Sequence, residues 1–344
     1  MTVTIAANID EVLEFMVGSM QYEWGHPDDE GVGYNSREGG YLGATIYEGW
    51  DFARDILSIE AEIENDALID DISDALSDSS WCKVDPYALS QNEELYFNWK
   101  LFSEQVKHET RYVFFKTSSE IDSNGLLLNP YEILDFIGEN IEKLGLIKFV
   151  SKLTIYRARV SNKGEYFYTA KEVGTPPKEY ALTSNRMSPA GIPMFYGAID
   201  EETALTEVGY KKGVNVVASL GKFINTSNLI LIDLTSLPDA PSIFDEDNQK
   251  KRWIIKFFRS FLKDFVKPVE KDGAEHIDYV PTQIVTEYLR HLYRTSNKQQ
   301  INGIVYNSSK NGRKAYVLFF ENQDCTDAED LKGKLLLSRV YHKS

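Results

Sequence analysis

The sequence predicts an α+β protein in which a mainly α-helical segment precedes a compact sheet domain. Amphipathic helical patterns occupy the first 148 residues, whereas short runs rich in β-branched and aromatic residues, separated by turns or helical stretches, follow from residue 149. A chain of 344 residues, of which 42% are hydrophobic and 26% charged, is long enough to bury two cores. We therefore expect two domains, residues 1–148 and 149–344.

Negative charge is concentrated in the N-terminal part of the chain. Residues 1–120 contain 7 Lys and Arg against 25 Asp and Glu, whereas residues 121–344 contain 30 against 28. An acidic surface repels phosphate backbones, so we do not expect nucleic acid as a partner of the N-terminal part. The nearly neutral remainder can still hold a small anion locally.

The sequence shows no feature of a membrane protein or of a metal site. No stretch approaches about 18 consecutive apolar residues, and the first residues form neither a basic leader nor a cleavage site, so we expect a cytoplasmic protein without a membrane span. Cys82 and Cys325 are too few for a disulfide framework or a Cys-x-x-Cys metal site. We expect two free thiols and no metal.

Two helices are expected in the N-terminal part. Residues 59–79 place Ile63, Leu68, Ile72 and Leu76 at nearly helical spacing on an acidic background. Residues 92–115 repeat large apolar side chains, Trp99 among them, between polar positions. The apolar face around Trp99 exceeds what one domain can cover, which favours a homo-oligomer.

The C-terminal part alternates strands with helices. The strand-like runs are IYRARV, MFYGAI, VNVVASL, NLILIDL, GIVY and KAYVLFF. Helices are expected over residues 130–146, 200–211, 247–266 and 282–293. Together these elements predict a compact sheet with helices between its strands.

Three segments contain the residues suited to chemistry. Arg157 lies in the strand-like IYRARV, a long segment covers residues 185–208, and GIVYNSSKNG covers residues 303–312. In the middle segment a Pro-Gly turn and a strand precede a helix whose first turn is acidic, which suits the helix dipole. Glu207 lies beside the packing side of that helix, so its carboxylate can project across the neighbouring strand end.

These residues resemble the RES-domain family, which is named for an Arg, a Glu and a Ser. The match has the family's order: Tyr156-Arg157 in a strand, Arg186 before a Pro-Gly turn, Tyr196 ten positions later, Glu207 eleven further on, and a late Tyr-x-Ser formed by Tyr306 and Ser308. It covers about residues 150–320. The resemblance implies a fold related to ADP-ribosyltransferases and the degradation of NAD by phosphorolysis or hydrolysis, usually in a toxin restrained by a partner.

Each residue of the match has a physical reason to act on NAD. Cleavage of the nicotinamide-ribose bond builds positive charge on the ribose, and the carboxylate of Glu207 is the natural stabiliser. The guanidinium groups of Arg157 and Arg186 suit the NAD pyrophosphate, and Tyr196 offers a flat face or a hydroxyl. Ser308 is expected to bond a ribose or phosphate oxygen. We expect Glu207, Arg157 and Tyr196 to be catalytic, and Arg157, Arg186, Tyr196 and Ser308 to bind NAD.

Two choices stay open at this point. Arg159 lies two positions after Arg157 and points to the same side of the strand, so only the Tyr-Arg match favours Arg157. Ser309 also competes with Ser308, although its side chain should face the opposite way if the strand continues. Taken singly, each of these residues also has a structural explanation, and the ordered series is what favours function.

The N-terminal part resembles, less specifically, the helical domain that precedes RES domains and is grouped with the HEPN superfamily. The residues that carry this similarity are Trp99, Phe102, Lys107, His108, Arg111 and Tyr112. Some members of that superfamily are ribonucleases that use an Arg four to six residues before a His, and no histidine here has such an Arg. We therefore interpret His108 and Arg111 as a structural polar cluster.

The sequence thus predicts an NAD-degrading effector in a toxin–antitoxin or anti-phage role. NAD is the substrate, inorganic phosphate or water is the acceptor, and an antitoxin or regulatory protein is an expected partner. One rival activity is ADP-ribosyl transfer to a macromolecule, which uses the same bound NAD. The other rival is a non-catalytic module that binds a partner.

Overall fold

The computed structural model describes residues 8–37, 39–116, 129, 131–212, 215–268, 273–328 and 332–344. The chain forms two compact units, each drawn from two stretches of sequence. The first, here called the acidic unit, consists of Met1–Tyr96 and Asp239–Phe258, and the second, the sheet unit, consists of Phe97–Pro238 and Arg259–Ser344. These units describe packing, and the division of function at residue 149 stays a prediction.

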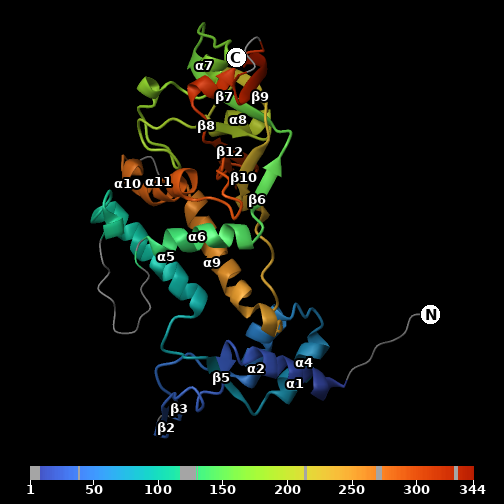
Figure 1. Cartoon of the computed structure of the whole chain (residues 1–344). Coiled ribbons are helices and arrows are strands. Elements are labelled where there is room, and N and C mark those ends of the chain that lie inside the picture. The colour runs from blue at the N-terminus through green and yellow to red at the C-terminus, as the bar shows by residue number, and fades with distance from the viewer. Residues whose placement is uncertain are drawn as a thin grey trace, which may run out of the picture. The chain divides into compact units, whose positions relative to one another are not determined.

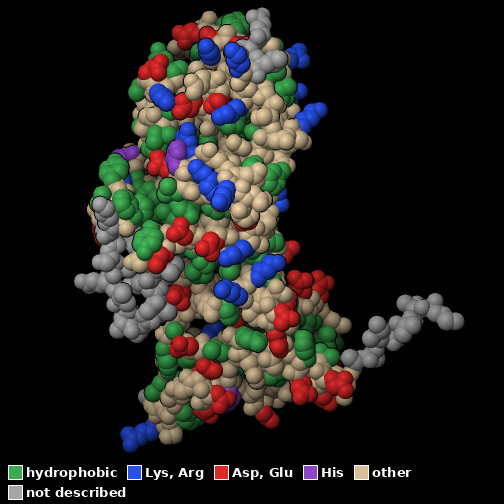
Figure 2. All heavy atoms as spheres, in the orientation of Figure 1, with side chains coloured by type: hydrophobic (Ala, Val, Ile, Leu, Met, Phe, Trp, Pro, Cys, Tyr) green, Lys and Arg blue, Asp and Glu red, His purple; other side chains and the backbone are tan. Residues whose placement is uncertain are grey.

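The acidic unit is mainly helical, and Figure 2 shows acidic side chains gathered over α1 and α4. Its helices are α1 (Ile9–Met20), α2 (Gly49–Phe52), a π-helical turn (Ala53–Leu57), α3 (Ser58–Glu60), α4 (Asp66–Ala75), a 3-10 turn (Glu246–Asn248) and the first part of α9 (Gln249–Val266). Its strands are β1 (Trp24–Gly25), β5 (Ser80–Lys83) and β4 (Tyr47–Glu48), in that order in one sheet, and the hairpin of β2 (Tyr34–Asn35) and β3 (Gly40–Tyr41).

Aromatic side chains form the centre of the acidic unit. The rings of Phe52 and Trp81 stack at 4.5 Å, and Trp24 meets Phe52 edge-on at 5.2 Å. The single helix predicted over residues 59–79 is wrong, because α3 ends at Glu60 and a new helix begins at Asp66. The side chain of Asn65 accepts hydrogen bonds from the first free N–H groups of α4, which starts the helix there.

One mixed sheet forms the framework of the sheet unit (Figure 1). Its order is β13-β14-β9-β7-β8-β12-β11-β10-β6, and its neighbours are antiparallel except for the pairs β10–β11 and β13–β14. The strands are β6 (Ile147–Val150), β7 (Thr154–Asn162), β8 (Phe195–Ala198), β9 (Val216–Asn225), β10 (Leu229–Asp233), β11 (Gly303–Asn307), β12 (Lys314–Leu318), β13 (Cys325–Thr326) and β14 (Leu335–Lys343). All six predicted runs are confirmed as strands.

Helices interrupt the sheet as the sequence predicted. They are α5 (Gln91–His108), α6 (Glu132–Lys143), α7 (Ala170–Val173), α8 (Glu201–Glu207), the last part of α9, α10 (Glu275–Asp278) and α11 (Val280–Glu287), with a π-helical turn (Tyr288–Leu292) and 3-10 turns at Phe114–Lys116, Lys178–Tyr180, Leu234–Ser236 and Asn322–Asp324. The helices predicted over residues 130–146, 247–266 and 282–293 are confirmed, although residue 130 lies outside the described residues. Two predicted helices end early: α5 at His108 rather than at residue 115, and α8 at Glu207 rather than at residue 211, because Gly209 takes a left-handed conformation. Cys82 and Cys325 are both free and buried, as expected. The α+β prediction is therefore confirmed.

A buried ionic cluster joins the two stretches that form the acidic unit. Arg252, with a side chain only 5% exposed, donates to Glu23 at 3.0 Å and to Glu60 at 2.6 Å. Burial raises the pKa of Glu23, but the cations Lys256, Arg252 and Lys83 outweigh it, so the pKa lies below its ordinary value. The folded unit therefore favours the charged carboxylate over the neutral acid.

Removal of Arg252 should destabilise the acidic unit strongly. Arg252→Ala leaves the buried carboxylate of Glu23 without its main donor, and we expect the free energy of unfolding to fall by about 3–5 kcal/mol. Arg54→Ala is the matched control, since it breaks an exposed pair with Asp70 in the same unit and should cost no more than about 1 kcal/mol. Urea denaturation followed by tryptophan fluorescence measures both, and equal losses would contradict the assignment.

Candidate active site

A cavity of about 230 Å³ opens in the sheet unit where α8 packs against β7 and β8. Three residues of the predicted site, Arg157, Tyr196 and Glu207, line it together although they lie far apart in the chain. The full lining is Tyr156, Arg157, Ala158, Asn185, Tyr196, Gly197, Ala198, Ala204, Glu207, Val208 and Tyr306. The structure thus gathers these three predicted residues in one hollow.

Arg157 projects from β7 and is fixed by main-chain carbonyl groups. Its Nε donates to the carbonyls of Val173 and Gly174 at 3.0 Å each, and its Nη1 donates to that of Tyr196 at 2.6 Å. Burial lowers the pKa of Arg157 to about 10, so the guanidinium is still charged at neutral pH. Among the described residues none bonds Nη2, which leaves that nitrogen for a ligand in the cavity.

Arg159 points to the same side of β7, as the strand period predicted, but it does not line the cavity. Its Nη1 donates to the carbonyl of Glu172, and its guanidinium lies 4.6 Å from the centre of the Phe167 ring. The structure therefore favours Arg157 over Arg159 as the arginine of the cavity.

Two phenol groups face the cavity in their neutral form. The hydroxyl of Tyr196 shares a hydrogen bond of 2.9 Å with that of Ser188, and burial raises the pKa of Tyr196 to about 12. Burial, and then the charge of Glu207, raise the pKa of Tyr306 above its ordinary value. Tyr306 stood in the predicted motif, but no role was predicted for it. Both phenols can donate hydrogen bonds at neutral pH, and neither is suited to act as a base.

Glu207 is the last residue of α8, and Ser308 holds its carboxylate. The Ser308 hydroxyl donates to Glu207 Oε1 and accepts from the N–H of Lys310 at 3.2 Å. Ser308 is only 2% exposed, whereas Ser309 is exposed, because β11 ends at Asn307 and the chain turns there. The structure therefore selects Ser308 as the partner of Glu207. Its predicted bond to a ribose or phosphate oxygen stays a prediction.

The turn at residues 308–313 also fixes the rest of α8. Lys310 Nζ donates to the carbonyls of Thr206 at 3.0 Å and Glu207 at 2.5 Å, where the helix ends and its carbonyls need donors. The amide of Asn311 donates to the hydroxyl of Thr203 at 3.0 Å. Sequence reasoning missed both contacts, which join residues more than 100 positions apart.

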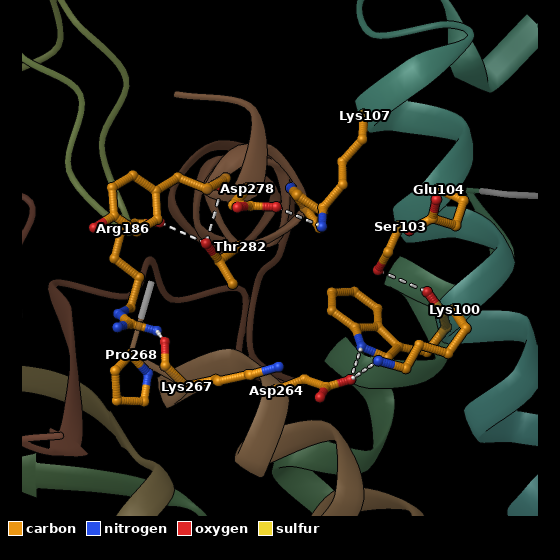
Figure 3. Close-up of a pocket in the computed structure, with 13 residues that line it drawn as sticks. Lys100, Ser103, Glu104, Lys107, Arg186, Asp264, Lys267, Pro268, Asp278 and Thr282 are labelled. Atoms are coloured by element: carbon orange, nitrogen blue, oxygen red, sulfur yellow. Dashed lines mark hydrogen bonds and ion pairs between the residues drawn. The ribbon is translucent and has the colours of Figure 1, made fainter. Parts of the chain in front are cut away.

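Arg186 lines a second cavity of the sheet unit (Figure 3). Its Nη1 donates to the carbonyls of Phe265, at 3.1 Å, and of Lys267. Burial lowers the pKa of Arg186, and the nearby Tyr279, Tyr306, Glu207 and Tyr196 act in the opposite direction. Arg186 is therefore close enough to the first cavity to act on it electrostatically, although it does not line it.

The polar cluster predicted around His108 is local to the end of α5. Arg111 donates to the carbonyls of Val106 at 3.5 Å and Lys107 at 3.2 Å, while His108 lies 3.8 Å from Glu104. Within the described ranges, no group of three or more His, Cys, Asp or Glu is placed to hold a metal ion. No helix in the described part of the chain has the length and apolar character that a membrane span requires.

Two family models match the chain and together cover most of it. The model of the HEPN/RES N-terminal domain 1 matches residues 2–120, and the model of the RES domain matches residues 154–336. No curated protein and no solved structure is similar enough to count as a match. The RES match spans more than half of the chain and includes the lining of the first cavity.

Replacing Ser308 should destabilise the sheet unit by removing a hydrogen bond to a charged group. We expect Ser308→Ala to lower the free energy of unfolding by about 1.5–3 kcal/mol, because the buried side of the Glu207 carboxylate loses its donor. Ser309→Ala changes an exposed hydroxyl one residue away and should stay within about 0.5 kcal/mol of the unaltered protein. Urea titration followed by far-UV circular dichroism tests the pair, and a reversed order would refute the assignment of Ser308.

Proposed function

The chain belongs to the RES-domain family, and on that basis we propose that it cleaves the bond between nicotinamide and ribose in NAD. RES domains are associated with toxin systems that act on NAD. The observation that carries the proposal is the meeting of Glu207, Arg157 and two neutral phenols in one cavity. A carboxylate beside guanidinium groups suits a substrate that is positive at one end and negative in its middle.

Glu207 has the position and charge to stabilise the reacting ribose. When the bond from ribose C1′ to the nicotinamide nitrogen breaks, its electron pair stays on that nitrogen and the pyridinium becomes neutral nicotinamide. Positive charge then builds on C1′ and the ring oxygen, where a fixed carboxylate stabilises the transition state more than the ground state. Because Ser308 and the turn behind it hold Glu207, the carboxylate needs little reorganisation during this step.

Inorganic phosphate or water then completes the reaction. If phosphate attacks C1′, a new C–O bond forms and the product is ADP-ribose 1″-phosphate. If water attacks, the product is ADP-ribose and one proton is released. A phosphate beside Glu207 needs compensating positive charge, which Arg157 and the nearby Arg186 supply.

The tyrosines hold the substrate rather than move protons. Neutral phenols can bond ribose hydroxyls, and the ring of Tyr196 or Tyr306 can cover the face of nicotinamide. Arg157 is the expected ligand for the phosphate next to the nicotinamide ribose, through the nitrogen that the main-chain carbonyls do not use. The two tyrosines and Arg157 then bind the parts of the substrate next to the bond that breaks.

The remaining parts of the proposal concern the whole protein. We assign it to the cytoplasm as a toxin or anti-phage effector, with residues 1–148 sensing, restraining or assembling and residues 149–344 degrading NAD. An antitoxin or regulatory protein would keep such an activity in check. The homo-oligomer loses the argument made for it, because Trp99 is buried within the sheet unit, only 2% exposed. The family membership supports the toxin role, and purification with and without genetic neighbours tests the partner.

Substitution of Glu207 should abolish turnover while leaving the fold intact. Glu207→Gln keeps the size of the side chain and removes its charge, so we expect kcat for NAD loss to fall at least about 10²–10³-fold. Glu139→Gln is the matched control, because Glu139 lies on α6 in an exposed pair with Lys143 and should leave kcat unchanged. Mass spectrometry of the products, with and without phosphate, measures the rate and identifies the acceptor.

The same experiment separates the rival functions. Free ADP-ribose or its 1″-phosphate supports the proposal, whereas label retained on a macromolecule would indicate ADP-ribosyl transfer instead. An unaltered protein that binds a partner but never consumes NAD would indicate a non-catalytic module. Full activity of the Glu207→Gln variant would contradict the proposed mechanism.

A further inference from the structure

The second cavity has the size and chemistry of a ligand site. It encloses about 380 Å³ within the sheet unit, between α5, the C-terminal end of α9 and the region of α10 and α11 (Figure 3). Its walls contain four cationic side chains and three carboxylates, together with Trp99, Tyr279 and two prolines. Cavities of about 300–1,000 Å³ with a few placed polar groups are typical ligand sites.

Consecutive residues of the loop before β8 line the two cavities. Asn185 lines the first cavity and Arg186 lines the second. The charge of Arg186 acts on Glu207, Tyr196 and Tyr306, all of which line the first cavity. Arg186 is therefore the cation of the second cavity that is placed to meet a substrate held in the first.

The first cavity is too small for a whole dinucleotide. Its volume of about 230 Å³ lies below the range of about 300–1,000 Å³ that encloses drug-sized ligands. If the nicotinamide riboside end occupies it beside Glu207 and the adjoining phosphate binds Arg157, the second phosphate and the adenosine must lie outside. The second cavity begins at the arginine expected to bind the diphosphate.

The ion pairs of the second cavity leave one lysine for a ligand. Lys100 is paired with Asp264 at 2.8 Å, and Lys107 with Asp278 at 2.9 Å. Lys267 makes no ion pair with any residue that the structure describes, and its carbonyl accepts from Arg186 Nη1. The Lys267 ammonium points away from the Arg186 guanidinium (Figure 3), so the two side chains present separate positive charges to a diphosphate.

We propose that the adenylate half of NAD occupies the second cavity, with its phosphate bound by Arg186 and Lys267. This inference rests on the proposed function and extends it to the part of the substrate that does not react. Tyr279 and the prolines offer apolar faces to adenine. One of the three carboxylates that line the cavity can accept hydrogen bonds from the ribose hydroxyls. Helix α5, which lies in the region matched by the HEPN/RES N-terminal model, then forms part of the substrate site.

Lys267→Glu in the full-length protein tests the placement with two substrates. NAD carries the adenylate half, whereas nicotinamide mononucleotide has the same reacting bond but lacks the adenylate. We expect the substitution to raise KM for NAD at least about tenfold, through loss of an attraction and gain of a repulsion, and to leave kcat/KM for the mononucleotide within about twofold. Lys263→Glu makes the same charge change at an exposed position of α9 outside the cavity lining and should leave both substrates unaffected.

Calorimetric titration with ADP adds a readout that needs no turnover. Weaker ADP binding by Lys267→Glu, with binding by Lys263→Glu unchanged, supports the placement. NAD cleavage with an unmoved KM in Lys267→Glu would overturn it, and so would an equal loss for the mononucleotide. Absence of NAD cleavage in the unaltered protein would instead overturn the proposed function, so the two failures are distinguishable.

Discussion

The candidate site depends on one constraint, which is that a helix of seven residues must hold its last side chain steady. A helix as short as α8 is not stable by itself, because too few hydrogen bonds compensate for the ordering of its backbone. Asp200 caps its first turn, and Lys310 supplies donors to its last carbonyls. With both ends fixed, the bond from Ser308 aligns the Glu207 carboxylate. The reactive geometry thus depends on a turn between two sheet strands.

In the proposed complex, charged groups of the two cavities face the opposite charges of NAD. Glu207 faces the pyridinium, and Arg157 and Arg186 face the diphosphate. Burial lowers the pKa of both arginines but leaves them cationic at neutral pH, while it keeps Tyr196 and Tyr306 uncharged. Removal of water from these groups strengthens each interaction with a charged substrate. The same burial that costs free energy on folding therefore increases discrimination among ligands.

The sequence was sufficient to identify the strands and three residues that line the first cavity, but neither the rest of the lining nor the contacts. Strand periodicity and an ordered motif brought Arg157, Tyr196 and Glu207 together, because antiparallel neighbours in one sheet convert distant positions into adjacent ones. The contact between Ser308 and Glu207 joins residues 101 positions apart through a turn whose geometry no local pattern encodes. Arg186 was predicted beside the others, yet its position depends on the carbonyls at the end of α9, which the sequence does not place.

The helical boundaries show a second limit of local reasoning. An unbroken acidic amphipathic pattern over residues 59–79 predicted one helix, whereas Asn65 begins a new one after Glu62 adopts a left-handed backbone conformation with a φ of 53°. The N-cap hydrogen bonds of Asn65 stabilise the start of α4 by about as much as helix propensities differ between residues. Periodicity therefore identified Ile72 and Leu76 as buried but was wrong for Leu68, which is 38% exposed, while capping decided where the helix starts.

The packing of α5 argues against dividing the chain into two separate domains by a single cut at residue 149. Trp99 packs edge-on against Phe261 at 4.9 Å, and its indole N–H donates to Asp264 at 3.2 Å, all within the sheet unit. Yet Trp99 belongs to the sequence matched by the N-terminal family model, and Phe261 to that matched by the RES model. A RES fragment that began at residue 149 would expose the apolar surface that Trp99 covers and lose one wall of the second cavity. The two family regions are therefore joined by a shared core at α5, so a conformational change in one has a direct physical route to the second cavity.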